Sequence, residues 1–350
     1  MICTKKILLP LSMLSLFGPV QAQTSVALYG VIDLGIAYAK GSRSNAVQVL
    51  PGGLHTPRLG FRATEGLGNG MSASLVLEAG YDPDDGMGKA TNTNNQRTGN
   101  TVPGGLTFNR RATLSLSGPW GEVRAGRDYV PQYMNFAIGD PHGLVGFGIA
   151  MPRRGLITGP AAIRASNSVS YHTPRSLGGF GINAMHYRGE NPGGTPTSDD
   201  GNGAGIRLSY EQGPFIGGIA TGRTNYAAGD SIQRNIAAAW DFGTFRVMAF
   251  MNSDRAGTLS ARGGVAGVQV PVGSGQFRFA YSYHRTDAPG NPEGRKLALG
   301  YVYNLSKQTA LYTTVARISN SGGAAHALVD DTTGANESTS GIVIGMRKHF

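Results

Sequence analysis

The segment Pro57–Tyr81, PRLGFRATEGLGNGMSASLVLEAGY, alternates between apolar and polar side chains. Before a glycine-rich break, Leu59 and Phe61 alternate with Arg58 and Arg62, and the alternation resumes after the break. A period of two residues is typical of β-strands, and a short glycine-rich break between two such runs predicts a hairpin turn. The segment is therefore expected to form two paired strands with one apolar face and one face that carries charge.

The same alternation recurs along the rest of the chain, and the connections between alternating runs are short and long in turn. The expected long, polar connections are residues 40–55, 82–105, 129–166, 189–204, 225–232, 253–263, 286–294 and 319–339. Eight long loops joined by short turns indicate sixteen strands. We therefore expect an all-β fold, a sixteen-stranded antiparallel transmembrane β-barrel with short periplasmic turns and long extracellular loops.

Closure of the sheet follows from the properties of lipid. An open amphipathic sheet would leave unpaired backbone groups at its edges, which a bilayer cannot satisfy, whereas a closed barrel satisfies them. A secreted β-sandwich with its apolar face inside is the soluble alternative. The sandwich is the weaker interpretation because it would not require long loops on one side only.

Residues 1–22 have the features of a secretory signal peptide. Lys5 and Lys6 precede an apolar run, and Val20-Gln21-Ala22 provides a cleavage site after Ala22. The run is too short to be a membrane-spanning helix. The mature barrel would comprise residues 23–350, exported to the cell outer membrane. The single cysteine, Cys3, would leave with the signal, so no disulfide or thiol chemistry is expected.

The charge of the chain is basic. Of 31 basic residues, two lie in the signal peptide, so 29 remain against 21 acidic ones, a net charge of +8. The excess is arginine spread singly along the strands, which disfavours a nucleic-acid surface. An arginine facing lipid at the bilayer midplane costs about 2–4 kcal/mol. A sixteen-stranded barrel has an interior too wide for side chains to fill, so the strand arginines are expected to face an aqueous lumen: Arg58, Arg62, Arg111, Arg207, Arg246 and Arg278.

Several stretches in order resemble one family. These are Ser25–Tyr38, Arg58–Glu78, Phe108–Pro131, Asn167–Tyr187 and the terminal Phe350. Together they are similar to the trimeric general diffusion porins of Gram-negative bacteria, of the β-proteobacterial and Neisseria type. The resemblance implies a homotrimer in outer-membrane lipid and lipopolysaccharide. It also implies that the third long loop, residues 129–166, folds into the lumen and constricts it.

The resemblance also implies which residues line the constriction. Arg58, Arg62 and Arg127 match the wall arginines of the family, although strict alternation puts Arg127 on the lipid side unless a bulge turns it inward. The candidates on the loop are Asp140, Arg153 and Arg154. An inward arginine cluster would favour anions.

Two further residues are singled out. His172 stands where related porins often have arginine, and its charge could make conductance depend on pH; a neutral histidine near a turn is the alternative. Phe350 lies on the face of Ile342, Ile344 and Met346, and in the family such an end is recognised by the outer-membrane assembly machinery.

These observations predict a passive channel for small hydrophilic solutes and ions, with a preference for anions. The alternatives are a substrate-specific anion channel, or a barrel that serves mainly as an adhesin or receptor. An enzyme is not expected, because no spacing of serine and histidine singles out a triad for an outer-membrane phospholipase. No cofactor is expected, and the seven scattered histidines predict no metal site.

Overall fold

The computed structural model describes residues 24–97, 99, 105–174, 176–330 and 332–350. The expected signal peptide lies outside this range. Within the described residues, no helix is long and apolar enough to span a membrane.

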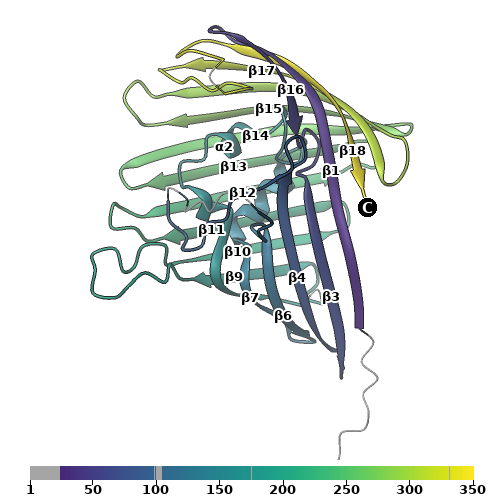
Figure 1. Ribbon diagram of the computed structural model, residues 1–350, viewed down its shortest axis with the longest axis vertical. Helices are drawn as coiled ribbons and strands as arrows, with labels where there is room; N and C mark the ends of the chain where they lie inside the picture. The colour runs from purple at the N-terminus through teal and green to yellow at the C-terminus, as the bar shows by residue number, and fades with distance from the viewer. Residues whose placement is uncertain (1–23, 98, 100–104, 175, 331) are drawn as a thin grey trace, which may run out of the picture.

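Sixteen antiparallel strands form a closed barrel, as predicted (Figure 1). The barrel closes because β1 (Thr24–Lys40) pairs with β3 on one side and with β18 on the other. The remaining strands are β3 (Arg58–Gly68), β4 (Met71–Asp82), β6 (Arg111–Gly118), β7 (Gly121–Tyr129), β8 (Arg164–His172), β9 (Phe180–Tyr187), β10 (Gly203–Gln212), β11 (Phe215–Thr224), β12 (Ser231–Asp241), β13 (Arg246–Ala256), β14 (Leu259–Val272), β15 (Gly275–Thr286), β16 (Glu293–Asn304), β17 (Thr309–Ser321) and β18 (Thr339–His349).

Two short strands belong to the long connections. β2 (Asn45–Pro51) pairs with the upper half of β1, and β5 (Met87–Gly88) pairs with the end of β4. Short and long connections alternate as expected, with one exception. The prediction of a long loop over residues 253–263 was wrong, because only Gly257 and Thr258 join β13 to β14. The polar residues there belong to strands that continue beyond the apolar part of the wall.

The outer face of the barrel is apolar and ends in an aromatic rim on the side of the short turns. On β12, Ile236 is 53% and Trp240 45% exposed, while the intervening Ala237 and Ala239 are buried. A row of rings with centroids 4.6–6.2 Å apart runs along the turn ends of β9 to β13: Phe180, Tyr210, Phe215, Trp240, Phe242 and Phe245. Such a row is typical of a membrane interface.

Part of the inner face is also apolar, which the alternation did not predict. Met248, Phe250 and Val265 point inward and are buried, because the β7–β8 connection packs over them. The inner wall is therefore apolar where the connection covers it and polar where it does not.

The chain end contributes to closure. The backbone N–H of Gly30 donates to the carbonyl of Phe350 at 3.0 Å, and the N–H of Phe350 donates to the carbonyl of Gly30 at 3.2 Å. The Phe350 ring lies so close over Gly30 that a Cβ there would come within 2.2 Å of it. Gly30 thus allows the last residue to pack against the first strand.

We expect Gly30→Ala to push the Phe350 ring aside and to destabilise the barrel by about 1–3 kcal/mol, the usual cost of overpacking. Gly66→Ala is the matched control, since a Cβ on Gly66, also in a strand, meets nothing within 4 Å. Urea unfolding in lipid vesicles measures both variants. Equal stability of the two would show that the Phe350 contact does not help to close the barrel.

Candidate functional site

The connection between β7 and β8, residues 130–163, lies against the inner wall. It contains η1 (Pro131–Tyr133), α1 (Met134–Gly139), α2 (Met151–Arg154) and η2 (Pro160–Ala162). α1 contacts β11, β12 and β13, whereas α2 contacts β14, β15 and β16. The connection therefore covers one side of the interior and leaves the other side, formed by β3, β4, β6 and β7, uncovered.

Buried polar side chains attach the first half of this connection to the wall. The Asn135 amide donates to the side-chain oxygen of Asn235 at 2.9 Å and to the carbonyl of Gly218 at 3.1 Å. Arg207 donates from Nε to the side-chain oxygen of Asn135 at 2.7 Å. The strand arginine Arg207 thus faces the interior, where it positions the connection.

Apolar packing and a buried lysine attach the rest. The rings of Phe136 and Phe250 have centroids 4.1 Å apart. The Nζ of Lys296 donates to the carbonyls of Phe147 at 3.2 Å and Ile149 at 2.6 Å, and Ser282 accepts from the N–H of Met151. Because these contacts come from separate strands, the connection is held at several points.

Asp140 was expected at the constriction, but it is only 2% exposed and does not line the cavity between the connection and the uncovered wall. Its carboxylate accepts from the backbone N–H of His142 at 2.8 Å and from that of Ala150 at 2.9 Å. It therefore holds the two ends of a turn inside the connection. Burial raises the pKa of Asp140, although the backbone donors and Lys296 act against this shift.

His142 makes the seating of the connection sensitive to acid. Burial, with the nearby charges of Arg278 and Lys296, lowers the pKa of His142 to about 3 from an ordinary value of 6.5. As the pH falls, His142 therefore binds a proton more readily when the connection has left the wall than when it is packed against it. The stability that neutral His142 contributes is complete above pH 6.5 and is lost as the pH falls toward 3, by about 5 kcal/mol in total.

We expect backbone amides of residues 131–150 to lose hydrogen-exchange protection, corrected for intrinsic rates, between about pH 7 and about pH 4. His142→Gln should remove most of this loss. Asp140 acts in the opposite direction because its pKa is raised, so Asp140→Asn should make the loss steeper. The same loss in wild type and His142→Gln would contradict the assignment to His142.

A cavity of about 720 Å³ lies between the connection and the uncovered wall. Tyr133, Met134 and Val145 line it from the connection. Besides His55 and His172, its charged lining residues are seven cations and one carboxylate: Arg58, Lys89, Arg110, Arg111, Arg124, Arg153, Arg164 and Asp128. The cavity is therefore strongly cationic, with the charge mainly on the wall.

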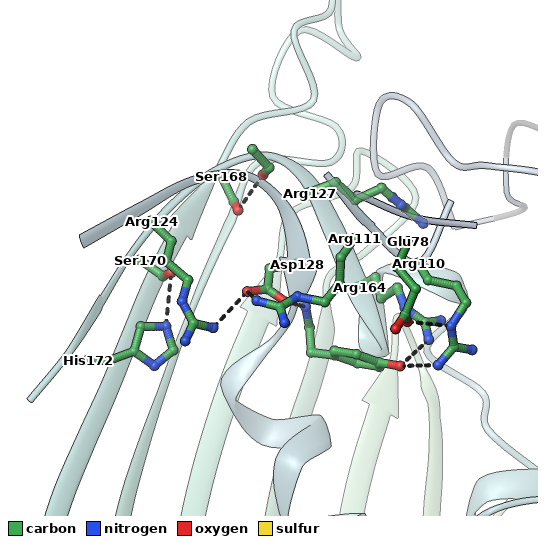
Figure 2. Close-up of polar contacts among 12 residues, drawn as sticks. Glu78, Arg110, Arg111, Arg124, Arg127, Asp128, Arg164, Ser168, Ser170 and His172 are labelled. Carbon is green, nitrogen blue, oxygen red and sulfur yellow. Dashed lines mark hydrogen bonds and ion pairs between the residues drawn. The ribbon is translucent and has the colours of Figure 1, made fainter. Parts of the chain in front are cut away.

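Three carboxylates hold the wall arginines in place: Glu78 and Asp128, which Figure 2 labels, and Glu122, which accepts two hydrogen bonds from Arg124, each at 2.8 Å. Asp128 contacts Arg111 and Arg124, each at 3.0 Å, from adjacent strands. Glu78 accepts from Nε of Arg110 at 2.6 Å and lies 3.5 Å from Nε of Arg58. Three carboxylates thus pair with four arginines, Arg58, Arg110, Arg111 and Arg124, so the cluster keeps an excess of positive charge in a fixed arrangement.

Tyr129 links two further arginines. Its hydroxyl accepts from Arg110 at 2.8 Å and also from Arg164. The guanidinium of Arg164 lies 4.1 Å from the centroid of the Tyr129 ring, a cation–π contact. The Tyr129 side chain thus positions these cations side by side at the cavity.

Arg127 does not line this cavity, in contrast to the expectation. A bulge interrupts the pairing of β7 with β8 between Gly126 and Asp128. Arg127 donates to the carbonyls of Asn109 at 2.6 Å and Asn92 at 2.9 Å, both in the β4–β6 connection. Figure 2 shows Arg127 apart from Asp128 and Arg124. The alternation of β7 is kept, and Arg127 anchors a loop.

The other expected residues are distributed along the interior. Arg153 lies 5.8 Å from the ring centroid of Tyr133 at the cavity, whereas the neighbouring Arg154 turns away to Ala327 and Asp330 in the β17–β18 connection. Arg62 lies 5.8 Å from the ring centroid of Tyr29. Arg278 lines a separate opening beside the β16–β17 turn, and Arg246 is half-buried on the inner face of β13.

His172 lies at the edge of the cavity, on β8. Its ring nitrogens are 3.2 Å from Ser170 Oγ and 2.5 Å from the side-chain amide of Asn183. It therefore belongs to a polar network of the wall next to Arg124.

Sequence reasoning missed three cavity arginines and two of the carboxylates that hold them. Arg124 lies on the same face of β7 as Glu122 and alternates with the exposed Val123 and Ala125, so the period of the strand could have identified it as inward. Arg110 and Arg164 lie at or just before a strand end, and Glu78 interrupts an otherwise apolar run. The alternation of polar and apolar residues does not predict whether side chains at strand ends point inward or outward.

Comparison with known proteins agrees with this architecture. The family model described as Gram-negative porin matches residues 11–323. The outer membrane porin protein 32 of Delftia acidovorans is 31% identical, over 99% of this chain and all of that one. The chain belongs to the Gram-negative porin family. It is an outer membrane protein, as predicted. An outer membrane porin of Bordetella pertussis is 27% identical, over 88% of this porin and 92% of that one.

Solved structures match the porin along nearly its whole length. An anion-selective porin from Comamonas acidovorans superposes with a TM-score of 0.81 at 29% identity, over 94% of this chain and 100% of that one. OmpT of Vibrio cholerae, in a trimer form, has a TM-score of 0.65 at 12% identity and covers 93% of this chain and 99% of its own. The second match supports the fold alone. These relatives are porins and not enzymes.

Proposed function

We propose that this porin forms a water-filled channel for passive diffusion of small hydrophilic solutes and prefers anions. The observation that carries the proposal is the cavity between the connection and the wall, where seven cations face one carboxylate. The anion selectivity named for the Comamonas acidovorans structure supports the same preference for anions. No catalytic step and no cofactor are part of the proposal.

The mechanism is electrostatic. A unit charge about 8 Å from a passing ion, at an effective dielectric constant of about 40, contributes about 1 kcal/mol. Several fixed guanidinium groups therefore lower the barrier for an anion and raise it for a cation by a few kcal/mol before screening by salt. Glu78, Glu122 and Asp128 reduce this field without cancelling it, because seven cations line the cavity.

The residues 130–163 serve as the constriction in this proposal. They narrow the interior from one side, and the arginine wall limits it from the other. The constriction sets the upper size of the solutes, and the fixed charges set their sign.

We further propose that the porin is a homotrimer in lipid and lipopolysaccharide. The outer faces of β3 and β6 expose apolar residues such as Phe61 (39%) and Leu114 (65%), which suit a contact between copies. The mass of the detergent-solubilised protein measured by light scattering tests the trimer. A mass of one chain under native conditions would exclude it.

Phe350 is proposed as the signal for the assembly machinery. Its side chain is 47% exposed on the outer face, although its backbone pairs with Gly30. An aromatic end that stays accessible on the last strand suits recognition before closure.

Stepwise conductance in a planar bilayer tests the channel itself. The proposal predicts discrete, ohmic steps from purified, folded protein. Correctly folded protein without conductance would instead favour a plugged barrel or an adhesin.

A further inference from the structure

A belt of exposed cations runs along part of the outer face of the barrel, at the strand ends opposite the aromatic rim. Seven successive strands, β11 to β17, each place one exposed arginine there: Arg223, Arg234, Arg255, Arg262, Arg285, Arg295 and Arg317. Each belongs to the outer face, since its neighbours in the strand alternate with it in burial. These arginines face away from the lumen, and none of them is among the six strand arginines that the sequence analysis placed there.

Most of this charge has no protein partner. Arg223 pairs with Asp230 at 2.5 Å, and Arg295 pairs with Glu293. In the part of the chain that the structure describes, the other five form no ion pair and no side-chain hydrogen bond. Arg262 and Arg285 stand directly opposite each other on β14 and β15. Like charges in this arrangement are unfavourable unless an anion lies between or beside them.

Two sets of three residues have the same arrangement. On β12, β13 and β14, Arg234 pairs in register with Ser253, and Ser253 with Arg262. On β17, β18 and β1, Arg317 pairs with Ser340, and Ser340 with the exposed Lys40. Each set, here called a cationic triplet, puts a serine hydroxyl between two cations. Since neighbouring strands are about 4.8 Å apart, the two cations of a triplet start about 10 Å apart, within reach of a single phosphate.

An apolar groove lies directly beside each triplet. The first groove has a volume of about 710 Å³ and contains Arg234, Ser253 and Arg262 of the first triplet; its apolar lining includes Ile206, Leu208, Ile219, Ile236 and Met251. The second has a volume of about 480 Å³ and contains Lys40, Arg317 and Ser340; its apolar lining includes Tyr38, Leu297, Leu299, Val315 and Ile342. Each groove thus combines an apolar surface with two cations and a hydroxyl.

The two rims of the barrel differ in chemistry. The rim at the short turns carries rings such as Trp240 and Phe277, whereas the opposite rim carries the arginine belt. On β15, Arg285 lies eight positions after Phe277, which corresponds to a height of about 20 Å in a tilted strand. The belt therefore lies where lipid headgroups of the outer leaflet would meet the barrel.

We propose that each cationic triplet and its groove bind a phosphorylated glycolipid of the outer leaflet, of the lipid A class. Two cations and the serine hydroxyl hold a phosphate, and an acyl chain occupies the apolar groove. Because most arginines of the belt have no anionic partner in the protein, the belt favours this anionic lipid over a zwitterionic one. This inference rests on the proposed function only in requiring that the barrel lies in the outer membrane.

The test is binding of purified protein to bisphosphorylated lipid A, measured by native mass spectrometry, with dephosphorylated lipid A and inorganic phosphate in parallel. The variant Arg234→Gln/Arg262→Gln removes the first triplet, and Lys40→Gln/Arg317→Gln removes the second. The control Arg43→Gln/Lys307→Gln removes two exposed cations from a loop and a turn outside the belt.

Wild type should bind the bisphosphorylated lipid at least about ten-fold more tightly than the dephosphorylated lipid, because removing the phosphates removes the charge-assisted hydrogen bonds from the triplets. Each triplet variant should lose about one bound lipid, and the control should lose none. Equal binding by the triplet variants and the control, or affinity independent of lipid phosphate, would overturn the proposal. Competition by inorganic phosphate alone would show a free-anion site instead, which also contradicts it.

Conductance is recorded on the same preparations. The triplet variants should keep the wild-type conductance and ion selectivity, because their residues face outward. Absence of conductance in every preparation would contradict the proposed diffusion channel. The lipid-binding measurements would still show whether the triplets bind lipid A.

Discussion

Replacing Arg58 and Arg110 by glutamine is expected to lower the anion-to-cation permeability ratio by at least about ten-fold. Both arginines line the cavity and contact Glu78. Their removal takes away two positive charges and leaves the carboxylate of Glu78 without a cationic partner, although the Tyr29 hydroxyl still donates to it. Two charges worth about 1 kcal/mol each act on anions and cations in opposite directions, which gives a large change in the ratio even after screening. The zero-current potential in a KCl gradient measures it.

Two controls separate charge from structural damage. The triple variant that also carries Glu78→Gln removes the uncompensated carboxylate, so its ratio should lie between those of the double variant and wild type. Glu78→Gln alone should increase the preference for anions. A double variant with an unchanged ratio and intact folding would contradict the assignment of Arg58 and Arg110 to the selective region.

Truncating Phe136 to alanine is expected to free α1 from the wall and to increase single-channel conductance. Phe136 is 2% exposed and packs on Phe250, and Phe→Ala in such a position costs about 3–5 kcal/mol. That loss acts on a six-residue helix whose remaining anchors include the hydrogen bonds of Asn135 to the wall, so the constriction should loosen while the barrel remains folded. Conductance should rise and selectivity should weaken together.

Phe242→Ala is the control, because Phe242 is a large aromatic residue that is 56% exposed in a turn outside the lumen. It should leave conductance unchanged. If Phe136→Ala also leaves both conductance and selectivity unchanged, the connection does not limit the channel.

The barrel could be predicted from the sequence because one physical pattern governs every strand. Lipid outside and water inside require an alternation that Leu59, Phe61, Arg58 and Arg62 display directly. Resemblance to a known family then supplied the trimer and the constricting loop. The positions of Arg58 and Arg111 at the cavity follow from the same alternation.

The alternation gave no information within the loops. Asp140 and Arg154 both lie on the predicted constriction loop, yet one holds a buried turn and the other contacts a different loop. Their directions depend on short helices and turns that pack against distant strands. Met248 and Phe250 face inward for the same reason, since the seated loop provides an apolar partner inside the lumen.

The alternation also gives no information on how deep a side chain lies in the membrane. The penalty for an arginine facing lipid applies at the midplane and becomes small near the interface. Arg234, Arg262 and Arg285 lie near strand ends, so their outward direction carries little cost. A period of two residues assigns a face to each side chain, but it does not say how far that side chain lies from the lipid headgroups.

The central claim is that a wall of arginines makes the channel favour anions. The most direct test is the sign of the zero-current potential of wild-type protein in a planar bilayer under a KCl gradient. A potential that reports chloride preference, reduced by raising the ionic strength, is the predicted result. A potential that reports potassium preference would contradict the account, since the seven cations at the cavity could not then dominate the path of the ions.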